Sequence, residues 1–280
     1  MGFDPDMYRV NSVLSNLLIK AMAKEFKNEK NLKRISKFLL DFADALMVSG
    51  TQTSRIVRNV QRLSELLGCE VDLIMLPKTI IMTLTAKSGE AVTSVRKISP
   101  NNPNFTRLSE LRILSWEALS HGYSLRECES KFTEIMNEKQ RDWIKLALIV
   151  SIGNSAFCQL WGGTLLMLPL IFLGTFIGFS PRRKLLKNGL GMNPSFVCAA
   201  FISALIPGCG AIVFELNTDI ALSTSVLWLI PGVPLLNAVI DLFDGHILAG
   251  FSRLVKAMEL ILSISFGLLI AIIIIGHSIV

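Results

Sequence analysis

The sequence predicts an α-helical polytopic membrane protein with five transmembrane helices and an N-terminal α+β cytoplasmic domain. The chain has 280 residues, of which 51% are hydrophobic, and its mean hydropathy of +0.52 is too high for an ordinary soluble domain. Its charges are unevenly placed, because residues 1–142 carry 21 of the 28 Lys and Arg and 17 of the 22 Asp and Glu. We therefore expect a cytoplasmic α+β domain over residues 1–142 and a membrane domain over residues 143–280.

Five apolar runs in the second half are long enough to cross a bilayer core, which takes about 20 helical residues. They lie at roughly 143–160, 163–180, 193–214, 220–240 and 256–278. Short loops that stay in the cytoplasm are enriched in Lys and Arg. The loops at 161–163 and 215–219 contain neither residue, whereas the alternate junctions carry Arg141, Lys145, Arg182, Arg183, Lys184, Lys187, Arg253 and Lys256. This distribution predicts a cytoplasmic N-terminus.

The first half shows the patterns of a small α+β domain. Apolar residues recur at helical spacing over residues 32–67, with a break at Ser49-Gly50-Thr51, and Gly68 is placed to end the second helix. Three β-like runs follow, and residues 87–90 are typical of a hairpin turn between the second and the third. The expected strands are 71–76, 79–85 and 91–98, and two further helices are expected at 106–121 and 124–139.

No pattern of catalytic or metal-binding residues occurs in either half. There is no GxSxG, HExxH, Walker loop or paired Cys/His set, and the five cysteines lack CxxC spacing, so we expect no enzyme activity, no cofactor and no metal. Nor is there the basic stripe that nucleic-acid binding requires. His121 is expected to cap a helix or lie on the surface. Asp41 and Asp44 are interpreted as a solvated helix face, with an acid pair as the alternative.

The segment from Ser225 to Asp241 carries the strongest functional signal. Proline removes a backbone donor and clashes with the preceding turn, so the helix should kink or unwind near Pro231 and Pro234. Within a membrane, freed backbone groups are tolerated only against protein or a wet cavity. An intramembrane carboxylate usually faces an interior or a cavity. We therefore predict a substrate site built from Pro231, Gly232, Pro234, Asn237 and Asp241, with Asp244 in the following loop.

Other polar and small residues of the membrane half have two interpretations each. A second interruption is expected at residues 205–210, because Leu-Ile-Pro-Gly recurs 24 residues later. Paired interruptions are typical of transporter sites. Ser151 and Asn154 lie on a small, polar helix face that either packs against another helix or contacts substrate. Gly174 and Gly178 are interpreted as a packing pair.

These residues carry a resemblance to a known family. The run Ser225–Arg253, with Pro-Gly-Val-Pro, Leu-Leu-Asn-Ala-Val-Ile-Asp and Asp-Gly-His-Ile-Leu-Ala-Gly-Phe-Ser-Arg, resembles the threonine/serine exporter family and, within it, the split, YjjP-type members. Arg141-Asp-Trp143, Ala156-Phe-Cys158, Asn193-Pro194 and Ser49-Gly50 match in placement. One departure is that the family often has an acidic residue after its Gly-Ala, whereas Gly50 is followed here by Thr51-Gln52.

The resemblance implies an exporter of small hydrophilic metabolites in the bacterial inner membrane. Threonine and serine are the substrates of the fused family members, and succinate-like dicarboxylates are associated with the split form. Because fused members carry a second membrane domain, the resemblance also implies a separate YjjB-like small membrane subunit as partner. The alternative function is a membrane-anchored enzyme or metabolite sensor that acts through the N-terminal domain.

Overall fold

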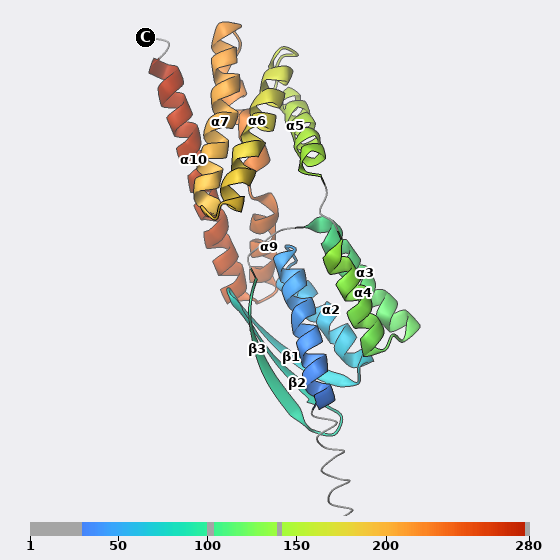
Figure 1. The fold of residues 1–280 in the computed structure, drawn as a ribbon. Coiled ribbons are helices and arrows are strands. Elements are labelled where there is room, and N and C mark those ends of the chain that lie inside the picture. Colours follow the sequence, from blue (N-terminus) through green and yellow to red (C-terminus); the bar gives the residue numbers. More distant parts are fainter. Residues whose placement is uncertain (1–29, 100–103, 139–141, 278–280) are drawn as a thin grey trace, which may run out of the picture. The chain divides into compact units, whose positions relative to one another are not determined.

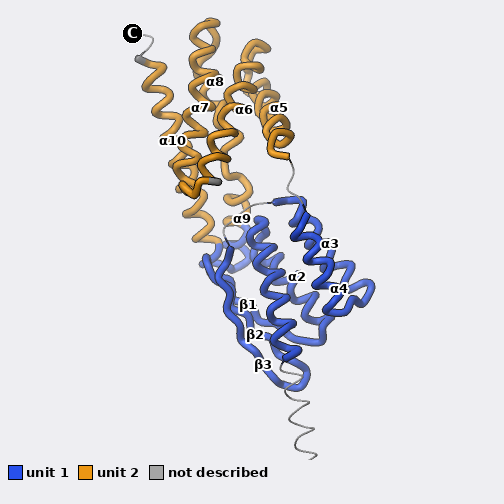
Figure 2. Tube along the Cα trace, viewed as in Figure 1, with its two compact units in different colours: residues 1–138, 240–249 blue, residues 139–239, 250–280 orange. Residues whose placement is uncertain are grey.

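The computed structural model describes residues 30–99, 104–138 and 142–277, so Arg141 lies outside the described residues (Figure 1). The chain forms two compact units (Figure 2). The first comprises residues 1–138 together with 240–249, and the second comprises residues 139–239 and 250–280. A ten-residue stretch from the predicted membrane half therefore belongs to the first unit.

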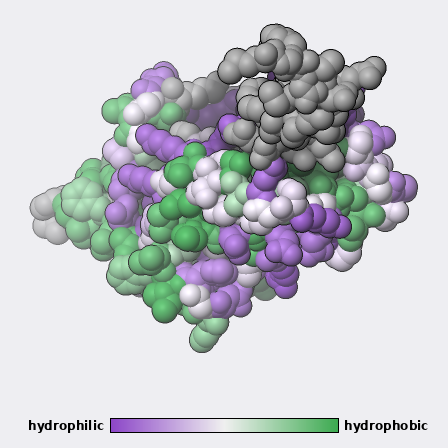
Figure 3. Space-filling view, turned by 90° about the horizontal axis from the view of Figure 1, so that it is seen from below, coloured by the Kyte–Doolittle hydropathy of each residue, from purple (hydrophilic) through white to green (hydrophobic). Residues whose placement is uncertain are grey.

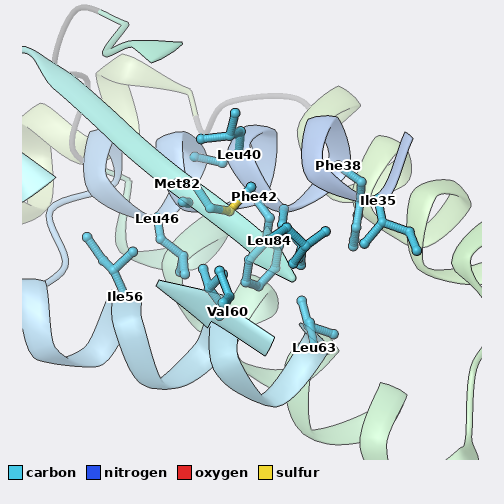
Figure 4. Close-up of a cluster of buried hydrophobic side chains, with 14 of the residues drawn as sticks. Ile35, Phe38, Leu40, Phe42, Leu46, Ile56, Val60, Leu63, Met82 and Leu84 are labelled. Atoms are coloured by element: carbon cyan, nitrogen blue, oxygen red, sulfur yellow. The ribbon is translucent and has the colours of Figure 1, made fainter. Parts of the chain in front are cut away.

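The first unit has one hydrophobic core between two helices and a sheet. A helix over residues 30–48 and α2 (Thr53–Leu66) are joined by a turn, and apolar side chains on both helices are buried at helical spacing. In Figure 4, side chains from these helices and from β2 (Thr79–Ala86) point toward one another. Those that are fully buried include Phe42, Leu46, Ile56, Val60, Leu63, Met82 and Leu84.

The sheet is an antiparallel meander of β1 (Cys69–Leu76), β2 and β3 (Ala91–Lys97). Alternate residues of β2 are buried, which is the pattern of a strand with one face on a core. Gly68, at φ +75°, follows α2 and turns the chain into β1. Ala86 N–H donates to Glu90 O at 2.8 Å across the turn before β3. The helical hairpin, the three strands and this turn are confirmed to within a few residues.

Two further helices complete the first unit, α3 (Phe105–His121) and α4 (Leu125–Asn137). Each begins at a side-chain cap: Asn104 accepts from the Arg107 N–H, and Ser124 forms a reciprocal capping box with Glu127. These backbone bonds hold the pKa of the Glu127 carboxyl below its usual value. His121 is exposed in the last turn of α3, as predicted.

Asp41 and Asp44 join the helix over residues 30–48 to the end of the sheet, and the solvated-face interpretation is wrong for Asp44. The Asp44 side chain is only 7% exposed, and its carboxylate accepts from Ser99 N–H at 3.0 Å and from Ser99 Oγ at 2.7 Å. Asp41 forms an ion pair with Arg96 of β3. A buried carboxylate needs such donors, because an unpaired buried charge is strongly unfavourable.

The reactivity of the Cys128 thiol, on α4, tests the packing of the hydrophobic core of the first unit. The residue is fully buried, and burial, followed by the nearby charge of Glu127, raises its pKa from 9.0 to about 11. We expect native Cys128 to be alkylated by iodoacetamide at pH 8 about a hundredfold more slowly than in urea, because the thiolate is the nucleophile. Mass spectrometry of the alkylated peptide measures both rates.

The same pKa shift has a consequence for stability. The folded pKa lies above the unfolded one, so this contribution to stability is complete below about pH 9 and is lost as the pH rises toward 11. A Cys128→Ser variant serves as the control, because it should lack this part of the alkaline loss. Equal alkylation rates in the native and the urea-unfolded chain would contradict the burial of the thiol.

The second unit contains most of the apolar helices of the chain. Helix α9 runs from this unit into the first, and α10 begins in the first unit and continues here. The bounds are α5 (Trp143–Leu160), α6 (Met167–Lys187), α7 (Met192–Val213), α8 (Thr218–Ser225), the short 3₁₀ helix η1 (Leu227–Leu229), α9 (Gly232–Phe243) and α10 (Ile247–His277).

Three helices in the described part of the chain are long and apolar enough to cross a membrane: α5, α7 and α10. The pair Thr218–Leu229 and Gly232–Phe243 adds a fourth if it is one broken span. The run predicted at 163–180 forms α6, which is not among them, because its apolar part ends at Arg182 and Arg183. The described helices therefore support three or four spans, and the count of five stays a prediction.

Two expectations for the membrane half are wrong. The interruption expected at residues 205–210 does not occur, because α7 runs continuously through Pro207. Helix α10 begins at Ile247, earlier than the span expected from residue 256, since a helix can continue past the apolar stretch that hydropathy detects. Arg253 and Lys256 thus lie within the helix and not in a loop.

Close packing of α6 on α7 depends on glycine. A Cβ atom added to Gly174 would lie 2.7 Å from Ser203 O, and one added to Gly178 would lie 2.2 Å from Ser203 Oγ. Small residues let helix backbones approach in this way. The predicted role of Gly174 and Gly178 as a packing pair is confirmed.

Seen from below, the surface mixes hydrophilic and hydrophobic residues without a single apolar face in that view (Figure 3).

Candidate functional site

The helix break predicted at Pro231 is present. Helix α8 and η1 end at Leu229, α9 begins at Gly232, and the two parts of this pair are bent by 61°. Pro231 stands between them, where no helical N–H is required of it, and its carbonyl accepts from Leu235 N–H at 3.0 Å. Pro234 lies in the first turn of α9, a position that tolerates proline, so it causes no second break.

Helix α9 carries the two polar residues predicted for the site. Asn237 and Asp241 are four positions apart and therefore share one face of the helix. Both are buried, with 7% of Asn237 and none of Asp241 exposed. Asp244 follows the end of α9 and is exposed, as predicted. Along α9, the buried carboxylate is thus Asp241.

Asp241 binds the first residue of α2, within the first unit. Its Oδ1 accepts from the Thr53 N–H at 2.8 Å, and its Oδ2 accepts from Thr53 Oγ1 at 3.0 Å. The first N–H groups of a helix have no partner inside the helix, and its N-terminus carries a partial positive charge. The N-cap residue Gln52 makes no side-chain cap, so the carboxylate from α9 performs this role across 188 positions.

Three residues close to Thr53 in the sequence carry hydroxyl groups. Ser49, Thr51 and Ser54 each have a buried side-chain oxygen without a hydrogen-bond partner in the described part of the chain. Gly50, at φ +97°, ends the preceding helix in a Schellman motif: Thr51 N–H donates to Leu46 O at 3.2 Å, and Gly50 N–H donates to Met47 O at 3.1 Å. Tight turn geometry therefore places these small polar residues beside the start of α2.

The corner formed by Ser49–Ser54 and Asp241 can hold charge away from water. Its carboxylate can carry a proton or meet a cation, and its unpaired hydroxyls can donate to or accept from a bound group. The sequence pattern predicted Asp241 but did not reveal Thr53. The only local sign was a Thr at the first helical position after a Ser-Gly turn.

Asn154 and Ser151 lie in the second unit and join helices there. Asn154 Nδ2 donates to Thr175 Oγ1 at 2.8 Å and to Ser225 O at 3.4 Å, which connects α5 with α6 and α8. Ser151 Oγ donates to the carbonyl of Ala147, one turn earlier. Both residues are buried. Their contacts are those of helix packing, and Thr175 is a partner that the sequence pattern did not reveal.

Comparison with protein families adds to this geometry. Residues 37–275 match the family ThrE, whose description is "Putative threonine/serine exporter". The chain belongs to this threonine/serine exporter family. The match includes Asp241, Thr53 and the break at Pro231, and it confirms the resemblance expected from the Pro-Gly, Asn and Asp segment.

Curated proteins similar to the chain carry transporter names. The chain is 27% identical over 245 residues to "Probable succinate transporter subunit YjjP" of Klebsiella aerogenes. The match covers 85% of this chain and 93% of that protein. The protein of the same name from Escherichia coli K12 is 28% identical over 240 residues, 82% of this chain and 91% of that one. No solved structure matches the chain.

A third relative is longer than this chain. The "Probable threonine/serine exporter" of Mycobacterium tuberculosis is 23% identical over 253 residues, which are 87% of this chain and 47% of that protein. A transporter family together with long apolar helices identifies a membrane protein. Family membership favours transport over the alternative of an anchored enzyme or sensor.

Proposed function

We propose that the chain is one subunit of an exporter for small hydrophilic metabolites. The substrate is a succinate-like dicarboxylate or threonine and serine. The single observation that carries the proposal is a broken apolar segment whose second helix bears a fully buried carboxylate, Asp241. Interrupted helices supply transporters with exposed backbone dipoles and a place for polar residues at membrane depth.

The proposed substrate site uses the residues of the break and the face that follows it. The positive end of the α9 helix dipole, at the break, meets a substrate carboxylate, and Asn237 donates a hydrogen bond to it. Asp241 binds an ammonium group or, for a dicarboxylate, carries a proton, because two anions would repel each other. Pro234 directs the start of α9, and Ser151 and Asn154 complete the polar path.

The proposed location is the bacterial inner membrane, with the N-terminus in the cytoplasm and the first unit mostly on that side. The placement of Lys and Arg near alternate ends of the predicted spans supports this orientation. A second, YjjB-like membrane subunit completes the transporter. This partner is supported by the word "subunit" in the names of the Klebsiella and Escherichia relatives.

Efflux from preloaded cells tests the proposal. Cells loaded with labelled succinate, threonine or serine produce the chain alone, a YjjB-like partner alone, both proteins or neither. We expect efflux of one substrate class only when both proteins are present in the membrane. Equal efflux by the partner alone, with insertion of each protein verified, would show that this chain is not needed for transport.

A further inference from the structure

A partly buried cation, Arg182, is held between aromatic rings in the second unit. The guanidinium carbon of Arg182, on α6, lies 4.7 Å from the ring centroid of Phe196 on α7 and 5.8 Å from that of Trp228 on η1. Phe179 stacks on Trp228 with centroids 5.5 Å apart, and Trp228 Nε1 donates to Ser203 Oγ at 3.2 Å. Aromatic faces thus fix the position of this side chain.

No anion of the described chain balances Arg182. Its Nε is buried and has no hydrogen-bond partner among the described residues. None of the ion pairs found in the described ranges includes it. A guanidinium has five N–H donors and stays charged, so burial without an acceptor is costly. Stacking on rings satisfies the flat faces of the group, whereas the buried Nε–H lies in the plane and still needs an acceptor.

We propose that Arg182 binds the carboxylate of the transported metabolite. This inference rests on the proposed export function. A planar guanidinium matches a carboxylate in a two-point contact, and this geometry is lost with Lys. Succinate, threonine and serine all carry a carboxylate, so one cation serves either substrate class.

The position of Arg182 suits the uptake of substrate for export. In the predicted orientation, the basic residues at 182–187 lie at the cytoplasmic side, from which an exporter takes its substrate. Trp228 belongs to the short helix that ends at Leu229, directly before the break at Pro231. A carboxylate bound to Arg182 therefore acts on the broken segment through Trp228, whose ring lies beside the guanidinium.

Binding of succinate to the purified full-length chain tests the inference. We expect the wild-type chain in detergent to bind succinate and not succinamide, its uncharged analogue. Arg182→Gln should weaken succinate binding about tenfold or more, since a charge-assisted two-point contact is lost. Arg182→Lys should fall between the two, and this variant keeps the test open if Arg182→Gln does not fold.

Arg183 provides a matched control. It is the sequence neighbour of Arg182, but its guanidinium lies 5.1 Å from the ring centroid of Trp143 on α5. Arg183→Gln should leave succinate affinity within about twofold, the size of effect expected from a distant surface charge. A succinate affinity unchanged in folded Arg182→Gln and Arg182→Lys would overturn the inference. Native mass spectrometry could also overturn it, if Arg182→Gln lost a bound anionic phospholipid and kept its affinity for succinate.

Efflux measurements separate this inference from the proposed function. If the two-subunit complex exports labelled carboxylate and the Arg182 variants export it at the wild-type rate, only the role of Arg182 is refuted. If the wild-type complex exports none of the three substrates, the proposed function itself fails. Reduced export by Arg182→Gln with normal export by Arg183→Gln is the result we expect.

Discussion

Asp241→Asn is expected to reduce export by roughly tenfold or more, the effect of about 1.4 kcal/mol on a rate-limiting barrier. Asn keeps the shape of the side chain and can still accept from the Thr53 N–H, while the Thr53 hydroxyl can turn to accept from the amide. The substitution therefore removes the charge and the capacity to carry a proton and preserves the contact with α2. Efflux under an imposed proton gradient, normalised to inserted protein, measures the loss.

Two further variants separate transport from structure at the same place. Asp241→Ala leaves the Thr53 donors buried without an acceptor, so we expect a loss of about 1–3 kcal/mol in the free energy of unfolding. Thr53→Val removes the hydroxyl donor alone and should cost less, while Thr53→Ser should behave as wild type. Wild-type export by a correctly inserted Asp241→Asn chain would show that the carboxylate only caps α2.

Gly267→Ala and Gly174→Ala are expected to destabilise the helix packing of the second unit by about 1–3 kcal/mol each. A Cβ at Gly267 would lie 2.3 Å from Val197 O and 2.9 Å from Ala200 Cβ, so α10 could no longer lie against α7. At Gly174 the nearest atoms are Ser203 O and the Pro207 ring, at 2.7 and 2.8 Å. These neighbours are backbone, Cβ or ring atoms, which cannot rotate away.

Gly153→Ala is the control for both substitutions. Gly153 is also helical, in α5, but among the described residues no atom beyond its own helix backbone and chain neighbours lies within 4 Å of an added Cβ. Alanine in an open helical position commonly stabilises a chain by about 0.4–1 kcal/mol. Thermal unfolding in detergent should therefore rank Gly153→Ala at or above wild type and the two packing variants below it. A loss of equal size in all three would contradict the close approach of these helices.

Local chemistry explains why most elements could be predicted from the sequence. The break between the first two helices follows from Gly50, which adopts positive φ, and the break before α9 follows from Pro231. The length of an apolar run placed α5 at Trp143–Leu160, as expected, and β-like runs placed the strands within a few residues. Such signals act over a few residues, so they do not depend on the rest of the fold.

Errors arose where one local signal had two physical meanings. Hydropathy measures suitability for lipid and not helicity, so it missed the first residues of α10, which are helical although Arg253 and Lys256 lie among them. Proline weakens a helix, but Pro207 is accommodated inside α7, where Gly174 of α6 packs against its ring. Packing against neighbouring helices determines whether a helix is interrupted at a proline or continues through it.

Neighbouring residues alone specify the apolar segments, the break at Pro231 and the three strands, and they predict the burial of Asp241. The partners of these groups depend on tertiary packing. Thr53 receives its cap from Asp241, 188 positions away, and Arg182 lies among rings of α6, α7 and η1. No periodicity records such pairs, since long-range contacts arise from the way whole elements pack, and two residues far apart carry no common local pattern.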